Sequence, residues 1–134
     1  MSEPDLAEGR SLRLLVAEDN PTNQRVIAAL LSSFGHSFTI VPDGEQAVAA
    51  ASSGDFDAIL MDVQMPVMDG PTATRRIREL GGRAGLLPII ALTANAMPGQ
   101  RDEYLAAGMT DYLAKPIDIR ALYGALSKVV PLQG

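Results

Sequence analysis

Several side chains in this sequence have the types and spacing that would suit chemistry on a phosphoryl group held by a carboxylate. Asp62 ends an apolar run, residues 56–61, and a loop with Pro66 and Gly70 follows it. Further polar groups follow other apolar runs and are, in chain order, Glu18 with Asp19, Thr93, and Lys115. Apolar runs of branched residues are typical of strands buried on both faces, and open parallel sheets bind ligands beyond the carboxyl ends of their strands.

The acids predict a divalent-cation site. In a flavodoxin-like sheet the first and third strands are neighbours, so Glu18, Asp19 and Asp62 would converge at one edge. Carboxylates at that distance repel one another, and a hard cation with oxygen ligands relieves the conflict. Mg²⁺ suits such a set, with Mn²⁺ as the alternative. A lone acid at a strand end is usually only solvated, and it is the combination that favours a metal.

Thr93 and Lys115 complete the set. A threonine hydroxyl can donate a hydrogen bond to a phosphoryl oxygen, and a lysine ammonium suits a phosphate or a carboxylate. Alone, Thr93 would be a turn or cap residue and Lys115 a surface lysine. Their place at two further strand ends favours the functional interpretation.

Composition excludes several classes of protein. The chain has 134 residues, a formal net charge of -5, no cysteine and one histidine, His36. These features indicate one domain and argue against disulfides, thiolate chemistry and a zinc site built from several histidines. The sequence has no basic stripe, which disfavours direct binding to nucleic acid. It also has no apolar run long enough to cross a membrane. We expect a cytoplasmic location.

Strand-like and helix-like segments alternate five times. Strands are predicted over 12–17, 37–41, 58–62, 88–93 and 110–114, and helices over 21–34, 45–53, 70–80, 97–107 and 118–130. This alternation predicts an α/β fold, a flavodoxin-like doubly wound sheet of five parallel strands in the order 2-1-3-4-5 with five helices. We expect a flexible leader over 1–10, the domain over 11–131 and a tail over 132–134.

Spacing within two helices predicts which side chains face the core. The expected core residues are Ala73, Ile77 and Leu80 in the third helix, and Ile119, Leu122, Tyr123, Leu126 and Val130 in the last. Arg75, Arg76 and Arg78 are interpreted as a solvated helix face. The glycine-rich residues 81–85 are expected to form a flexible connection.

Four stretches together resemble the receiver domain of response regulators in two-component signalling. They are VAEDN at 16–20, MDVQMPVMDG at 61–70, ALTA at 91–94 and KP at 115–116. The resemblance extends over 12–130 and is closest in style to receivers that occur alone or fused to hybrid histidine kinases. It implies that Asp62 accepts a phosphoryl group from a phosphohistidine, in a Mg²⁺-dependent reaction, and later loses it to water.

The resemblance also implies individual roles. Asp19 would bind Mg²⁺ directly, Glu18 mainly through water, and Gln64 through its backbone carbonyl. Thr93 and Lys115 would contact the acyl phosphate, and the Lys115–Pro116 bond would be cis. Tyr112 falls at the switch aromatic that responds to Thr93, although from the residues alone it is equally an edge-strand aromatic half covering the core. Gln64 and Asn95 would tune the hydrolysis.

The implied partner is a histidine-bearing helical bundle. It would be the dimerisation and phosphotransfer domain of a histidine kinase, a histidine phosphotransfer protein, or another domain of the same chain, docking near residues 20–25. Two other functions stay open: a receiver used only for docking, and a metal-dependent phosphatase with an aspartyl nucleophile. A flavodoxin-like redox domain is disfavoured because Glu18 and Asp19 would repel a flavin phosphate. A nucleotide-binding P-loop is disfavoured because residues 81–85 follow a helix and precede a strand.

Overall fold

The computed structural model describes residues 11–94 and 97–129 and contains a five-stranded parallel sheet. The strands lie in the order β2-β1-β3-β4-β5, which confirms the predicted topology. Their bounds are β1 (Arg13–Ala17), β2 (Ser37–Val41), β3 (Ala58–Asp62), β4 (Ile89–Thr93) and β5 (Asp111–Ala114). The predicted leader 1–10, the tail 132–134, Asn95 and the predicted core residue Val130 lie outside the described residues.

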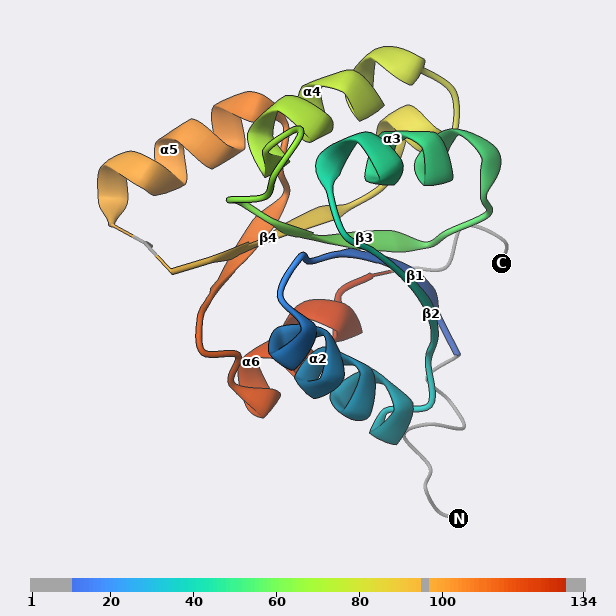
Figure 1. The fold of residues 1–134 in the computed structure, drawn as a ribbon, viewed down its shortest axis with the longest axis vertical. Coiled ribbons are helices and arrows are strands. Elements are labelled where there is room, and N and C mark those ends of the chain that lie inside the picture. Colours follow the sequence, from blue (N-terminus) through green and yellow to red (C-terminus); the bar gives the residue numbers. More distant parts are fainter. Residues whose placement is uncertain (1–10, 95–96, 130–134) are drawn as a thin grey trace.

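Helices cover both faces of this sheet (Figure 1). The α-helices are α2 (Pro21–Ser33), α3 (Gly44–Ser53), α4 (Gly70–Leu80), α5 (Pro98–Ala107) and α6 (Ile119–Ser127). Helices α2 and α6 lie on one face and α3, α4 and α5 on the other. Residues 81–85 were predicted to form a flexible connection. A short 3-10 helix, η1 (Ala84–Leu86), begins within this segment. In the described part of the chain, no helix has both the length and the apolar character needed to cross a membrane.

Side-chain caps start four of the helices. Asn20, Asp43, Asp69 and Asp118 each accept a hydrogen bond from a backbone N–H in the first turn of the helix that follows. A cap of this kind satisfies donors that the helix itself leaves unpaired. Asn20 therefore determines where the chain turns into a helix just after β1, and Asp69 does the same at the end of the loop that follows β3.

The three central strands supply the core. All five residues of β3 and all five of β4 are buried, as are four of the five in β1. Side chains alternate between the two faces, so Leu14, Val16 and Leu60 pack under α2 and α6, whereas Ile59 and Met61 pack under α3 to α5. The polar residues at the ends of these strands consequently project from the most rigid part of the molecule.

Three predicted core positions are wrong. Leu80, Ile119 and Tyr123 are 43%, 49% and 43% exposed. Leu80 is the last residue of α4, at the flank of a buried face made by Gly70, Ala73, Thr74 and Ile77. In α6 the buried face is formed by Leu122, Ala125 and Leu126, so Ile119 and Tyr123 lie at its edges. Apolar spacing therefore identified the helices, but packing against the sheet selected the rotation of each one.

Arg78 also departs from its interpretation as a solvated side chain. Arg75 and Arg76 are exposed, whereas the guanidinium of Arg78 donates hydrogen bonds to the carbonyls of Gly85, Leu87 and Gly108. Burial lowers the pKa of Arg78 from its ordinary value. Its role is structural, because it ties α4 to the connection before β4 and to the turn after α5.

Candidate functional site

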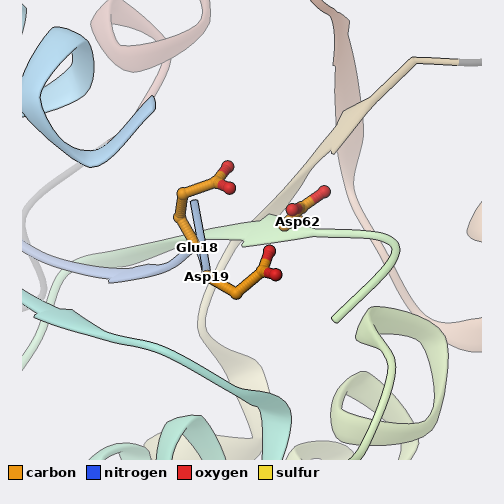
Figure 2. Close-up of side chains that lie close together, drawn as sticks. All are labelled: Glu18, Asp19 and Asp62. Carbon is orange, nitrogen blue, oxygen red and sulfur yellow. The ribbon is translucent and has the colours of Figure 1, made fainter. Parts of the chain in front are cut away.

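Three carboxylates meet where β1 and β3 end. In the parallel register Ala17 lies beside Met61, so the residues that follow them leave the sheet at the same edge. Glu18, Asp19 and Asp62 each contribute one carboxylate oxygen to a group in which all these atoms lie within 4.8 Å of one another. Figure 2 shows the three side chains gathered at these strand ends. The convergence predicted from the strand order is present.

Glu18 is fully buried and held by the start of α2. Its Oε2 accepts hydrogen bonds from the backbone N–H of Asn20, at 3.1 Å, and from the side-chain amide of Asn23, at 3.4 Å. The side chain of Gln24 donates to the Glu18 carbonyl at 2.6 Å. A buried carboxylate is costly unless its oxygens are paired, so the first turn of α2 compensates for part of the burial of Glu18.

Lys115 joins two of the acids. Its Nζ lies 3.1 Å from Glu18 Oε1 and 3.1 Å from Asp62 Oδ1. The backbone N–H of Lys115 donates to the Thr93 carbonyl at 2.8 Å, and the following Lys115–Pro116 bond is cis. Burial on its own would lower the pKa of Lys115, but the hydrogen bonds and charges of Asp62 and Glu18 outweigh burial and raise it. Lys115 is therefore a cation held against two carboxylates.

Asp62 is a carboxyl group with altered acidity. Burial raises its pKa from 3.8 to about 6, the hydrogen bond from Lys115 opposes that effect, and the negative charge of Glu18 adds to it. A second cation beside Asp62 would lower the pKa again, because an adjacent positive charge favours the ionised form.

The cluster fits Mg²⁺. Glu18, Asp19 and Asp62 supply the hard oxygen donors that Mg²⁺ prefers, and Asp19 is exposed, which leaves room for the waters that this ion retains. Glu18 Oε1 is buried and its partner is the Lys115 ammonium at 3.1 Å, so the case for a cation is carried by the donor set of the three acids.

A cleft of about 420 Å³ opens over the cluster, which is ample for a phosphoryl group. Thr93, Gln64 and Lys115 line it together with Asp62 and the other acids, and exposed Ala94 lies next to Thr93. The structure thus brings together the predicted phosphoacceptor, metal ligands, hydroxyl and ammonium. Their roles in catalysis stay predictions.

Five residues in the lining were not identified from the sequence as parts of the site: Asn20, Asn23, Val63, Gln100 and Tyr104. Tyr104 is the most informative, because its hydroxyl lies 2.8 Å from Thr93 Oγ1 and both side chains are buried. The available signal was weak: Tyr104 is the one aromatic residue of the polar helix α5. The spacing of residues in α5 gave no sign that Tyr104 would contact Thr93 at the end of β4.

Tyr112 lies outside the lining of the cleft. It is half-buried on β5, packs against the core under α3 to α5, and has the guanidinium of Arg101 5.2 Å from its ring centroid. This position agrees with an edge-strand aromatic that half covers the core. The switch role implied by the resemblance is untested by the geometry.

The loop between β3 and α4 brings the backbone close to Asp62. The N–H of Gly70 donates to the Val63 carbonyl at 2.9 Å, and a Cβ added to Gly70 would lie 2.3 Å from the Asp62 carbonyl oxygen. Val67 at the tip of this loop has φ of 70° and is 73% exposed. A β-branched residue rarely adopts this left-handed conformation, so the loop is held in a strained shape beside the site.

Comparisons with known proteins agree with this geometry. A family model described as the response regulator receiver domain matches residues 14–127. The sensor kinase BarA of Escherichia coli K12 is 42% identical over 92% of the chain, which spans 13% of BarA. Two-component response regulator 24 of Arabidopsis thaliana is 38% identical over 94% of the chain and 88% of its own length.

Two solved structures are informative. The receiver domain of sensor histidine kinase PA1611 from Pseudomonas aeruginosa, with magnesium in its active site cleft, is 50% identical with a TM-score of 0.82, covering 89% of this chain and 97% of that one. The receiver of Ssk1, in complex with the histidine phosphotransfer protein Ypd1 of Saccharomyces cerevisiae, is 28% identical with a TM-score of 0.82, covering 88% of both chains.

Proposed function

Because this chain belongs to the response regulator receiver family of two-component phosphorelay signalling, we propose that Asp62 is its phosphoacceptor and that Glu18, Asp19 and Asp62 hold Mg²⁺. One observation carries the proposal: the Asp62 carboxylate ends a buried strand within a cleft that also contains two further acids and an ammonium 3.1 Å away. That is an arrangement for placing an anion next to a nucleophilic carboxylate.

The residues divide the work of transfer. An oxygen of Asp62 attacks the phosphorus of a phosphohistidine, the P–O bond forms, and the P–N bond breaks with its electron pair returning to the imidazole, which takes up a proton. Lys115 neutralises charge on the transferred group, and the Thr93 hydroxyl donates to one of its oxygens. When bound, Mg²⁺ supplies further positive charge to these oxygens. Water later attacks the phosphorus of the mixed anhydride, the bond between phosphorus and the Asp62 oxygen breaks, and inorganic phosphate leaves as the Asp62 carboxylate is regenerated.

We further propose that Gln64 and Asn95 tune the hydrolysis of the phosphoryl group on Asp62. Gln64 lies in the loop that follows Asp62, is exposed and lines the cleft. This position supports a role in hydrolysis. Asn95 belongs to the same proposal by the resemblance alone. Gln64 offers no carboxylic acid to protonate a leaving group, which disfavours the phosphatase alternative.

The proposed donor is a histidine on a helical bundle, either within a hybrid kinase or on a separate phosphotransfer protein. The complex of the Ssk1 receiver with Ypd1 supports the second arrangement, and the relationship to BarA supports the first. In either case the domain would act in the cytoplasm, with the rim of the cleft at the start of α2 available for docking.

Phosphoryl transfer from a small P–N donor, phosphoramidate, tests the assignment. With Mg²⁺, the wild-type chain should gain one phosphoryl group by intact-mass spectrometry, and Asp62→Asn should gain none while keeping its fold by circular dichroism. Asp69→Asn is the matched control, because Asp69 lies in the same loop but caps α4, a task that asparagine performs equally well. Labelling of Asp62→Asn at the wild-type rate would refute the proposal.

A further inference from the structure

A buried hydrogen bond joins α5 to the end of β4 at the edge of the cleft. The Tyr104 hydroxyl lies 2.8 Å from Thr93 Oγ1, and the two residues are only 3% and 2% exposed. Both also line the cleft that contains Asp62 and Lys115. The contact therefore belongs to the site, although Tyr104 comes from a helix that contributes none of the acids.

The chemistry of the two hydroxyls favours one direction for this bond. Each hydroxyl can donate one hydrogen and accept others. A phenol is more acidic than an aliphatic alcohol, so Tyr104 is the better donor and Thr93 the better acceptor. When Tyr104 donates, the hydrogen of Thr93 can be donated onward, and hydrogen bonds in such a chain strengthen one another.

We propose that Tyr104 is a positioning residue for phosphorylation, whose hydroxyl orients and polarises the Thr93 hydroxyl toward the phosphoryl group on Asp62. This inference rests on the proposed function, because it takes Thr93 as a phosphoryl contact. The phosphoryl group is an anion, and hydrogen bonds to ionised acceptors are stronger than those to neutral ones. Polarising the Thr93 hydroxyl therefore strengthens its hydrogen bond to the phosphoryl group.

The hydroxyl can be removed while the aromatic ring is kept. The ring of Tyr104 packs in the cluster under α3 to α5 with Ile77, Ile89 and Met109. Tyr104→Phe keeps that ring and deletes only the oxygen. Tyr123→Phe is the matched control: Tyr123 lies on α6 at the opposite face of the sheet, is 43% exposed, and packs edge-on against Phe34 at 5.2 Å.

A beryllofluoride titration in the presence of Mg²⁺ tests the role of Tyr104, because this anion mimics a phosphoryl group on a carboxylate. Binding is followed by amide shifts in NMR for the wild type, Tyr104→Phe, Tyr123→Phe, Thr93→Ala and the double variant of Tyr104 and Thr93. Tyr104→Phe should bind roughly two- to tenfold more weakly, the loss expected for one hydrogen bond. Tyr123→Phe should match the wild type, and Tyr104→Phe should cause no further loss once Thr93 is alanine.

Each other result has a defined meaning. Equal or tighter binding by Tyr104→Phe overturns the inference, since tighter binding would mean that Tyr104 restrains Thr93 away from the phosphoryl group. A full additional loss in the Thr93→Ala background also overturns it, because Tyr104 would then act through the core and not through Thr93. If the wild type itself failed to bind beryllofluoride, the proposed function would be refuted. That result is distinguishable from the two results that refute only the role of Tyr104, because in those the wild type still binds.

Discussion

At the scale of single residues, charge balance around Lys115 is the central feature of the site. Its ammonium lies 3.1 Å from each of two carboxylates, and Glu18 is fully buried. A buried pair contributes little net stability, but removing one partner leaves an uncompensated buried charge. Lys115 therefore serves the resting fold as well as phosphoryl transfer, and a divalent cation at the same cluster could replace part of its charge.

We predict that Lys115→Met makes stability more dependent on divalent cations than it is in the wild type. Without Mg²⁺ the free energy of unfolding should fall by on the order of 3 kcal/mol, because Glu18 and Asp62 lose their counter-charge. Saturating Mg²⁺ should recover much of that loss, since an ion that binds only the folded state stabilises it. Urea denaturation with chelator and with Mg²⁺ measures both values.

Lys128→Met is the control, because Lys128 is exposed at the end of α6 and should change stability little in either condition. An equal effect of Mg²⁺ on the wild type and Lys115→Met would show that the metal and the ammonium do not share these carboxylates.

At the scale of elements, the loop between β3 and α4 is defined by close backbone contact. Gly70 begins α4, and its N–H returns to the Val63 carbonyl at 2.9 Å. The absence of a side chain allows this approach, because a Cβ there would lie 2.3 Å from the Asp62 carbonyl oxygen. The placement of Asp62 thus depends on a residue eight positions later in the chain.

We predict that Gly70→Ala destabilises the fold by about 2 kcal/mol, as overpacking usually does, and slows phosphorylation of Asp62 by phosphoramidate. The backbone around Asp62 must shift to admit the methyl group, which moves the carboxylate relative to Lys115. Denaturation and intact-mass kinetics report the two effects.

Gly124→Ala is a matched control in α6, where an added Cβ meets nothing within 4 Å. It should stabilise the protein by roughly 0.5–1 kcal/mol through the higher helix propensity of alanine, with no change in phosphorylation rate. If the two alanine variants behaved alike, close approach at Gly70 would not be the cause.

At the scale of the whole molecule, one neutral histidine contributes to how stability varies with pH. His36 Nδ1 accepts a hydrogen bond from the Leu12 N–H at 3.0 Å, which ties the end of the α2 segment to the start of β1. Burial lowers the pKa of His36 below 6.5, and the charge of Asp57 only partly opposes that effect. The folded protein therefore binds this proton less readily than the unfolded chain does.

We predict that this contribution to stability is fully present above about pH 6.5 and is lost as the pH falls through the pKa of folded His36. His36→Asn keeps an acceptor for Leu12 but does not titrate. The difference in unfolding free energy between the wild type and His36→Asn should thus shift against the wild type below pH 6.5. Asp62, whose raised pKa acts in the opposite direction, is common to both chains and cancels.

Urea denaturation of both proteins at intervals between pH 5 and 8 measures that difference. A difference that stays constant across this range would mean that His36 remains neutral, or is protonated equally, in both the folded and the unfolded states.

Much of this architecture could be predicted from the residues because its signals are local. Buried strands such as 58–62 are continuous apolar runs, and alternation of the two element types predicts a parallel sheet. The strand order then placed Glu18, Asp19 and Asp62 together, since parallel strands end at the same edge.

The sequence did not fully predict which face each helix buries or which residues on other elements its side chains contact. The exposure of Leu80 and Tyr123 and the hydrogen bonds of Arg78 depend on how each helix settles on the sheet, which spacing alone leaves open. The sequence by itself determined the fold, the acids, the hydroxyl and the ammonium. Tertiary structure alone decided that Lys115 bridges Glu18 and Asp62 and that Tyr104 reaches Thr93, because contacts across elements arise from packing of the whole core.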